Sequence, residues 1–267
     1  MLTYFLAYDF GYTLPWTHGH LIAAICLAAA AWLLARRKWR WTSRLLWALA
    51  AWALAGFLVI QFVFGFNRPM NLPAQSFMSA NTGRVLDLGA GSGRASVMVG
   101  LARPGVRVVG LDNFSAQYIE GNGPDLFMKN MRMAGMEKRA EILSADMRKI
   151  PAPDESYDAV VSSYAIDHLS RQGIEQTLGE VRRVLRARGE FLMIVFRPDF
   201  WLSVPYGPIP GRHIPRPEFW RTQLAQSGLD ILEEGTLPGT IYFYCRKKDT
   251  GTAILGNGNG TKEADRR

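Results

Sequence analysis

Two long apolar segments lie near the start of the chain, with a short basic segment between them. The first covers residues 21–35 and the second covers residues 45–66. Both are apolar on every side at helical spacing, which is typical of helices in lipid or in a large core. A bilayer core takes about 20 apolar residues to cross, so the second segment is long enough and the first is short. The pattern predicts a membrane-associated helical hairpin over residues 1–66; a hairpin buried against a soluble domain is the alternative.

Short apolar runs alternate with helical patterns from residue 83 to residue 247. The runs predicted as strands are RVLDL, VRVVGL, AEIL, YDAVVSS and GEFLMIVF, and two of the predicted helices cover residues 115–135 and 173–189. This alternation implies a parallel sheet covered by helices on both faces. Residues 229–237 and 240–248, which Pro-Gly joins, predict an antiparallel hairpin at the sheet edge.

These elements define the predicted fold class, which is α/β. We expect a Rossmann-like, mostly parallel seven-stranded sheet with an antiparallel edge hairpin, preceded by the N-terminal helical membrane hairpin. Residues 67–82 are polar and hold two prolines, so they predict a linker. Residues 83–247 form the predicted catalytic domain. Residues 248–267 are Gly-rich and polar, and they predict a disordered tail.

Composition narrows the choice of partners. The net charge is +8, but five positive charges lie in the hinge RRKWRWTSR at residues 36–44, and only about +4 remains from residue 67 onward. That balance does not call for a nucleic-acid partner. Cys26 and Cys245 give neither a disulfide framework nor metal-site spacing. The pair His18 and His20 has no visible partner ligands, so we predict no metal.

A glycine-rich turn is the sharpest motif. Residues 85–95, VLDLGAGSGRA, place an apolar strand, an acid and alternating glycines before a helical pattern, with the glycines at Gly89, Gly91 and Gly93. Glycines permit a tight turn and close approach of a ligand, and the helix N-terminus supplies free N–H groups. A dinucleotide fingerprint has a small third residue, where this chain has Arg94. The carboxylate of Asp87 would repel a pyrophosphate but suits an amino-bearing ligand, so S-adenosylmethionine is favoured over NAD.

Two further acids follow the next strands. Asp112 ends the second predicted strand, where an acid binds ribose hydroxyls in such folds. Asp146 lies just past the third strand, where its side chain can accept a hydrogen bond from an adenine amino group. Met147 is then placed to lie against the adenine ring.

With these blocks in order, the sequence resembles the class I S-adenosylmethionine-dependent methyltransferases, and within them the branch of the ubiquinone and menaquinone C-methyltransferases. The resemblance covers roughly residues 83–196 and is carried by VLDLGAGSGRA, VVGLDNF, ADMRKIPAPDESYDAVVSSYAIDHL and EVRRVLRARGEFLMIV. It implies that Asp87 and the three glycines hold the methionine end, that Asp112 holds the ribose, and that Asp146 and Met147 hold the adenine. The remaining residues of the expected cofactor-binding set are Ala90, Asn113 and Ser163.

The end of the fourth predicted strand supplies the candidate catalytic residues. Methyl transfer from a sulfonium is an in-line displacement, in which the protein positions the nucleophile and excludes water. Tyr164, Asp167 and His168 follow the strand and would face the methyl group. The family often has a pair of histidines here, whereas this chain has only His168. The alternative is structural, with Asp167 near the N-cap of a helix.

Residues 196–220, FRPDFWLSVPYGPIPGRHIPRPEFW, hold six prolines and six aromatic residues. Prolines disfavour regular structure, so we expect an irregular segment. It is either a stiff connecting loop or a wall of the acceptor pocket that also touches lipid. In the second case Arg212, His213 and Arg216 could meet an anionic head group.

The basic hinge raises a question of topology. S-adenosylmethionine is made inside cells, so we expect the catalytic domain on the cytoplasmic side of the cell membrane. The charges of residues 36–44 also favour the cytoplasm, and a hairpin that crosses twice cannot satisfy both. Either the hairpin dips into the cytoplasmic leaflet and the hinge binds anionic head groups, or it crosses twice with the hinge outside. The hairpin is also a candidate surface for a homo-oligomer.

The sequence therefore predicts a membrane-bound methyltransferase whose acceptor is hydrophobic or partitions into membranes, such as a lipid or a quinone precursor. Two alternatives stay open. One is methylation of a small thiol or another volatile or toxic acceptor. The other is a membrane scaffold that binds the cofactor without turnover.

Overall fold

A mixed β-sheet forms the centre of the molecule. The computed structural model describes residues 8–115, 119–207 and 214–249. Within these residues the sheet has seven strands in the order β3-β2-β1-β4-β5-β7-β6. The strands are β1 Gly83–Leu88, β2 Val106–Asp112, β3 Ala140–Ser144, β4 Tyr157–Ser163, β5 Leu185–Phe196, β6 Leu229–Leu237 and β7 Thr240–Lys247. β1 to β5 are parallel, while β7 is antiparallel to both β5 and β6, so the predicted fold class is confirmed.

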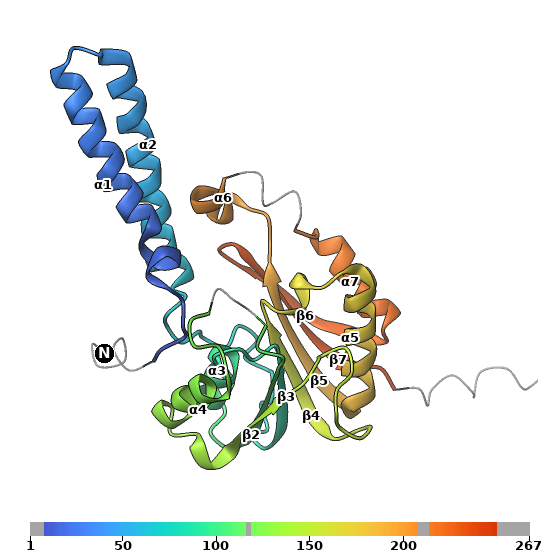
Figure 1. Ribbon diagram of the computed structural model, residues 1–267. Coiled ribbons are helices and arrows are strands. Elements are labelled where there is room, and N and C mark those ends of the chain that lie inside the picture. Colours follow the sequence, from blue (N-terminus) through green and yellow to red (C-terminus); the bar gives the residue numbers. More distant parts are fainter. Residues whose placement is uncertain (1–7, 116–118, 208–213, 250–267) are drawn as a thin grey trace, which may run out of the picture.

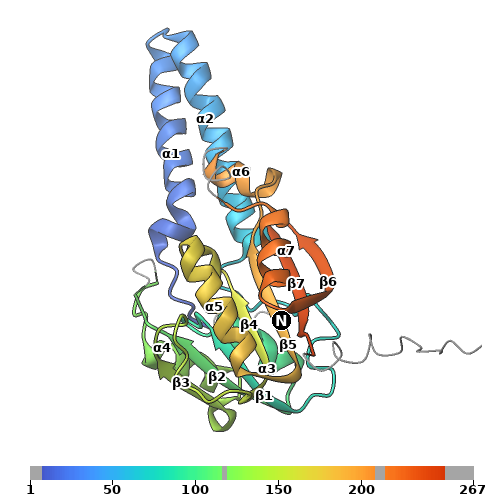
Figure 2. The same ribbon diagram turned by 90° about the vertical axis from the view of Figure 1, so that its right-hand side faces the viewer.

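Helices cover both faces of this sheet (Figures 1 and 2). One face carries α3 and α4, and the other carries α5 and α7; their bounds are α3 Arg94–Ala102, α4 Pro124–Met133, α5 Arg171–Val184 and α7 Pro217–Gln226. Along β1 the side chains alternate between the two cores. Val85 belongs to the core that also holds Met98 of α3, and Leu86 belongs to the core on the opposite face, which holds Leu178 of α5. Each large apolar side chain buried in this way stabilises the fold by about 1.5–3 kcal/mol.

Two predicted helices have different bounds in the structure. Residues 115–135 predict one helix, but α4 begins only at Pro124, because Gly121 has a positive φ of 68° and Gly123 is extended. Residues 173–189 also predict one helix, but α5 ends at Val184. Leu185 has an extended backbone and pairs with Tyr157, so it begins β5 instead.

The N-terminal hairpin is a pair of long helices that projects away from the sheet (Figure 1). α1 covers Leu14–Arg36, and α2 covers Arg40–Leu58 and continues as the π-helix η2, Val59–Phe64. Small residues fill the seam between the helices: Ala24, Ala31, Ala50, Ala53 and Gly56. Small residues at a seam are typical of helix pairs in membranes.

The first hairpin helix is longer than its apolar core. α1 has 23 residues, because it begins at Leu14 rather than at residue 21, and at about 1.5 Å per residue it is about 34 Å long. The expectation that the first segment is short for a crossing is therefore wrong. Within the described ranges, two helices, Leu14–Arg36 and Arg40–Phe64, are long and apolar enough to span a membrane by length and composition.

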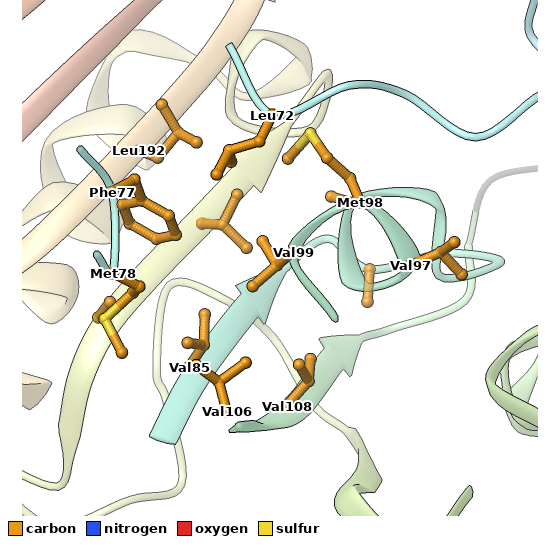
Figure 3. Packing of buried hydrophobic residues seen from close by; sticks show 14 of the residues in the cluster. Leu72, Phe77, Met78, Val85, Val97, Met98, Val99, Val106, Val108 and Leu192 are labelled. Carbon is orange, nitrogen blue, oxygen red and sulfur yellow. The ribbon is translucent and has the colours of Figure 1, made fainter. Parts of the chain in front are cut away.

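The segments that flank the hairpin pack into the core of the α/β domain. Phe10 is fully buried, and Asp9 exchanges hydrogen bonds with Asn130 of α4. The composition of residues 67–82 predicts a linker, yet Leu72 and Phe77 are buried in the core of the sheet, beside Leu192 of β5, as Figure 3 shows. The division into hairpin, linker, catalytic domain and tail stays a prediction. Residues 8–12, which that division assigns to the hairpin, pack with the α/β domain.

A short helix lies in the Pro-rich segment. Residues 196–220 are predicted to be irregular, but Phe200–Tyr206 form α6, and α7 begins at Pro217. Asp199 starts α6 by accepting a hydrogen bond from the backbone N–H of Leu202, so the expectation of no regular structure is wrong here. Arg212, His213 and the tail from residue 250 lie outside the described residues.

Candidate active site

The glycine turn after β1 is too tight for other residues at two positions. Gly89 has a φ of +72°, and an added Cβ would lie 2.2 Å from Cβ of Ala165. Gly93 has a φ of +85°, and a Cβ there would lie 2.7 Å from Cε of Met131. Both conformations are ones that L-residues rarely adopt. The turn therefore brings its backbone N–H groups to the carboxyl edge of the sheet, at the start of α3.

Asp112, at the end of β2, fixes this turn. Its Oδ2 accepts a hydrogen bond from the N–H of Gly91 at 2.7 Å, and its Oδ1 accepts one from the N–H of Phe114 at 2.5 Å. A carboxylate has about four acceptor positions, so both oxygens keep capacity for a ligand hydroxyl. This arrangement suits the predicted contact with the ribose, which stays a prediction.

Asp87 lies directly beneath the turn. Its side chain is 0 % exposed, and its Oδ2 accepts a hydrogen bond from the Ser96 hydroxyl at 2.6 Å. Among the described residues Oδ1 has no hydrogen-bond partner, and burial raises the pKa of Asp87 to about 7. A buried acceptor without a partner calls for a ligand group or a water. Asp87 itself is not among the residues that line the cavity beside the turn, and its contact with the amino group at the methionine end of S-adenosylmethionine stays a prediction.

A small cavity of about 50 Å³ adjoins the turn. It is lined by the predicted residues Gly89, Ala90, Gly91, Ser163 and Tyr164, together with Tyr12, Ser92, Arg94, Ala95 and Ile119. Sequence reasoning missed Tyr12 and Ile119, which pair as an antiparallel bridge across the turn. They lie more than 100 residues apart in the chain, and no local signal predicts that they meet.

The predicted adenine-side residues lie farther out on the same edge. Cε of Met147 would lie 3.1 Å from a Cβ on Gly89, so Met147 borders the turn. Asp146 makes a two-pronged ion pair with Arg148, which holds the pKa of Asp146 below its usual value. Asn113 accepts hydrogen bonds from Ser115. The assignment of these three residues to the cofactor stays a prediction.

The three predicted catalytic residues occupy different environments. The hydroxyl of Tyr164 is 2.8 Å from Oγ1 of Thr240, and its ring centroid is 4.5 Å from that of Phe196. Asp167 accepts a hydrogen bond from the N–H of Phe196 at 3.4 Å, and burial raises the pKa of Asp167. Burial also raises the pKa of Tyr164, so its hydroxyl stays protonated. His168 is exposed, and the structure does not bring it into the cavity beside Tyr164.

Arg94 connects the turn to the end of the hairpin. Its guanidinium donates hydrogen bonds to the carbonyl oxygens of Phe64 and Gly65, both at 3.0 Å, and of Arg68 at 2.9 Å. Carbonyl groups at a helix C-terminus have no partner within the helix, and a cation there is favourable. In the sequence, the signal for this contact is Arg94 itself, which stands where a dinucleotide-binding fingerprint has a small residue.

Among the residues that the structure describes, no three His, Cys, Asp or Glu side chains come together as metal ligands would. His18 instead lies with its Nδ1 2.8 Å from the hydroxyl of Thr17.

Comparisons with known proteins identify the domain. Residues 85–189 match the family model described as a methyltransferase domain. The chain is 31% identical to the demethylmenaquinone methyltransferase of Thermus thermophilus over 43% of this chain and 48% of the relative. It is 27% identical to the phosphatidylethanolamine N-methyltransferase of Cereibacter sphaeroides, over 49% of this chain and 61% of the relative. It thus spans about half the length of the curated relatives that it matches.

A solved structure shares the fold. A S-adenosylmethionine-dependent methyltransferase from Aquifex aeolicus superposes with a TM-score of 0.51 at 17% identity, over 62% of this chain and 82% of that chain. From the family model and the relatives, residues 85–189 lie in a class I S-adenosylmethionine-dependent methyltransferase domain, an enzyme domain whose cofactor is S-adenosylmethionine. The predicted family, fold and cofactor are confirmed.

Proposed function

We propose that the protein is a membrane-bound methyltransferase that transfers the methyl group of S-adenosylmethionine to a hydrophobic acceptor dissolved in the membrane. The observation that carries the proposal is the contact of Arg94 with Phe64 and Gly65. This contact joins Arg94, the first residue after the glycine turn at residues 89–93 (the cofactor turn), to the end of the apolar hairpin. A hairpin in the bilayer would hold the cofactor turn at the membrane surface, where a lipid-soluble acceptor is concentrated.

The surface of the hairpin supports membrane association. Apolar side chains are exposed around both helices, among them Ile25, Leu33, Leu45 and Leu54. Exposed tryptophans lie near both ends of α1, with Trp16 at the base and Trp32 toward the tip. Tryptophan at both ends of an apolar helix is typical of a segment that meets two membrane interfaces.

We further propose that the hairpin crosses the membrane twice. The cofactor is cytoplasmic, so the domain belongs on that side, and the basic hinge at residues 36–44 lies at the tip far from the sheet (Figure 1). The length of α1 removes one reason for placing the hairpin in one leaflet, which was the short first segment. In this arrangement the five cations meet head groups on the far face, against the positive-inside rule.

The relatives suggest the kind of acceptor. Three of those that match are named for demethylmenaquinone, a sterol and phosphatidylethanolamine, and these three acceptors share a large apolar body. The bound cofactor supplies an electrophilic methyl group on its sulfonium. Tyr164 would orient the acceptor from the cavity wall, and Asp167 would hold the backbone of Phe196 beside it. A role for His168 stays part of the prediction and is tested by His168→Ala.

Transfer of labelled methyl groups tests this function. The full chain in detergent is incubated with methyl-labelled S-adenosylmethionine and a solvent extract of cell membranes, and the labelled product is identified. Label in an organic-soluble product supports the proposal, and Asp112→Ala is the control with a damaged cofactor site. Label in the headspace would indicate a volatile acceptor instead. Intact cofactor binding without any transfer would indicate a scaffold.

A further inference from the structure

A second cavity, of about 410 Å³, lies between the end of the hairpin and the sheet. Three of its walls come from segments far apart in sequence. The π-helix η2 supplies Phe62 to Phe64, β5 supplies Ile194, and the turn between β6 and β7 supplies Leu237, Pro238 and Thr240. A π-helix is rare and often marks a functional site. The cavity is mostly apolar with a few polar groups, as small-molecule sites are.

The walls of this cavity are held in place by specific contacts. Gly239 lies so close to η2 that an added Cβ would be 2.4 Å from the ring of Phe64. Its N–H also donates a hydrogen bond to Asp199 at 2.9 Å, and Asp199 in turn starts α6. The turn between β6 and β7 is thus fixed against both the hairpin and α6.

The cavity adjoins the cofactor site through two shared residues. Arg94 and Tyr164 line both this cavity and the smaller one beside the glycine turn. The hydroxyl of Tyr164 bonds to Thr240, which lines the larger cavity. A molecule in the larger cavity therefore lies against residues that also border the cavity at the glycine turn.

A stripe of exposed apolar side chains leads from the hairpin to this cavity. Leu54, Leu58 and Phe62 follow one another at intervals of four residues along α2 and η2, and all three are exposed. Residues four apart lie on one face of a helix. Phe62 is 70 % exposed and Leu237 is 46 % exposed, and both line the cavity. An apolar molecule can thus pass from the hairpin surface into the cavity without crossing water.

The charges in the cavity restrict what it can bind. Its charged lining residues are Arg68 and Arg94, and no Asp or Glu is among the described residues that line it. Tyr164, Thr240 and Asn71 add hydrogen-bonding groups. Nearby cations favour the ionised form of an acid and oppose a protonated amine.

We infer that this cavity is the acceptor site and that the acceptor is an amphiphile with an apolar body and an ionisable oxygen, such as a phenol, an enol or a carboxylic acid. This inference rests on the proposed function and deepens it. The ionised acceptor gives an electron pair to the methyl carbon. The bond from that carbon to sulfur breaks, and its electron pair goes to sulfur. The negative charge of the acceptor and the positive charge of the sulfonium cancel, so no other reactant is needed.

Two leucines on one strand give a matched test. Leu237 lines the cavity, whereas Leu232, also on β6 and 47 % exposed, does not. Leu237→Trp should fill the mouth and lower methyl transfer to the membrane extract at least tenfold, while the Kd for S-adenosylmethionine by calorimetry stays within twofold of wild type. Leu232→Trp should transfer like wild type. Equal transfer by both variants would overturn the site.

Two further arms complete the test. If Leu237→Trp does not bind the cofactor, Phe62→Ala is used in its place, and Leu45→Ala at the tip of the hairpin is its control. Phe62→Ala should raise the KM for the extract at least fivefold. An unchanged KM would overturn the site. Before incubation, the extract is also separated into acidic, neutral and amine-bearing lipids. Transfer to an acceptor of the acidic fraction, or to a phenol or enol of the neutral fraction, supports the acceptor class, and transfer only to amines or to other neutral lipids overturns it. Absence of transfer by the wild type with intact cofactor binding would instead sink the proposed function.

Discussion

Nη2 of Arg94 donates a hydrogen bond to the carbonyl oxygen of Gly65 at 3.0 Å. Arg94 is the first residue of the helix that follows the cofactor turn, and Gly65 is the left-handed residue that ends η2. The same guanidinium nitrogen also holds the carbonyl of Phe64. The end of the hairpin and the cofactor turn are thus linked by one side chain, so the position of one constrains the other.

Replacing Arg94 should damage both stability and cofactor binding. Arg94→Gln removes charged hydrogen bonds to three carbonyl groups, each worth about 1.5–3 kcal/mol, and leaves those carbonyls without this partner. We expect a clear drop in Tm in detergent and at least a fivefold rise in the Kd for S-adenosylmethionine by calorimetry. Arg94→Lys keeps the charge and should lose less.

Arg103 provides the control for this prediction. Its guanidinium also donates to backbone carbonyls, those of Gln75, Phe77 and Ala102, but it lies at the far end of α3 from the turn. Arg103→Gln should lower Tm while leaving the cofactor Kd within twofold of wild type. If both variants weaken cofactor binding equally, the link through Arg94 has no special role in positioning the turn.

A methyl group on the cofactor turn should abolish cofactor binding. Gly89→Ala would put a Cβ 2.2 Å from Ala165 at a φ of +72°, so the turn must shift. Gly179→Ala is the matched control, because no atom lies within 4 Å of an added Cβ on that glycine of α5. Alanine in a helix is more stable than glycine by about 0.5–1 kcal/mol, so this variant should have a higher Tm and normal affinity. Calorimetric binding of S-adenosylmethionine by Gly89→Ala at wild-type strength would contradict the role of the turn.

Local patterns were enough to predict the strands and the acids that follow them. Asp112 and Asp146 each come at or after the end of an apolar run, and a few consecutive residues are enough to recognise such a run. The bridge between Tyr12 and Ile119 and the contact of Arg94 with Gly65 depend on long-range packing, which no local pattern encodes. Leu185 fits a helical stripe and a strand equally well, and its pairing with Tyr157 decides for the strand.

The hydroxyl of Tyr164 should matter for turnover and not for cofactor affinity. Tyr164→Phe removes its hydrogen bond with Thr240 in the wall shared by the two cavities. We expect about a tenfold lower kcat for label transfer with an unchanged cofactor Kd, which marks the loss of an interaction made in the transition state. Tyr157→Phe, at the other end of β4, is the control and should behave like wild type. Equal kcat for both variants would make Tyr164 structural.

The buried carboxyl of Asp87 should make stability depend on pH. Burial raises its pKa from 3.8 to about 7 in the folded protein. Between those values the folded state keeps a proton that the unfolded chain releases, so stability falls as the pH rises through this window. Asp87→Asn cannot lose a proton there. Both proteins are measured without cofactor. The Tm of Asp87→Asn minus the Tm of wild type should therefore increase from pH 5 to pH 8. A constant difference in Tm between Asp87→Asn and wild type over this pH range would contradict the prediction.

The side of the membrane that the hinge faces can be read with a single cysteine. Thr42 is exposed at the hinge, whereas its neighbour Ser43 is buried and donates a hydrogen bond to the carbonyl of Ala31, so Thr42→Cys is the accessible position. The exposed Cys26 is first changed to Ser, and the buried Cys245 is left in place. If the hairpin crosses twice, a membrane-impermeant thiol reagent should label Thr42→Cys in intact cells. Glu175→Cys, exposed on α5, should be labelled only after the cells are opened. If both positions are labelled only in opened cells, the double crossing is rejected and residues 36–44 lie at the cytoplasmic leaflet. In that case, changing their five cations to Gln should weaken binding to anionic vesicles.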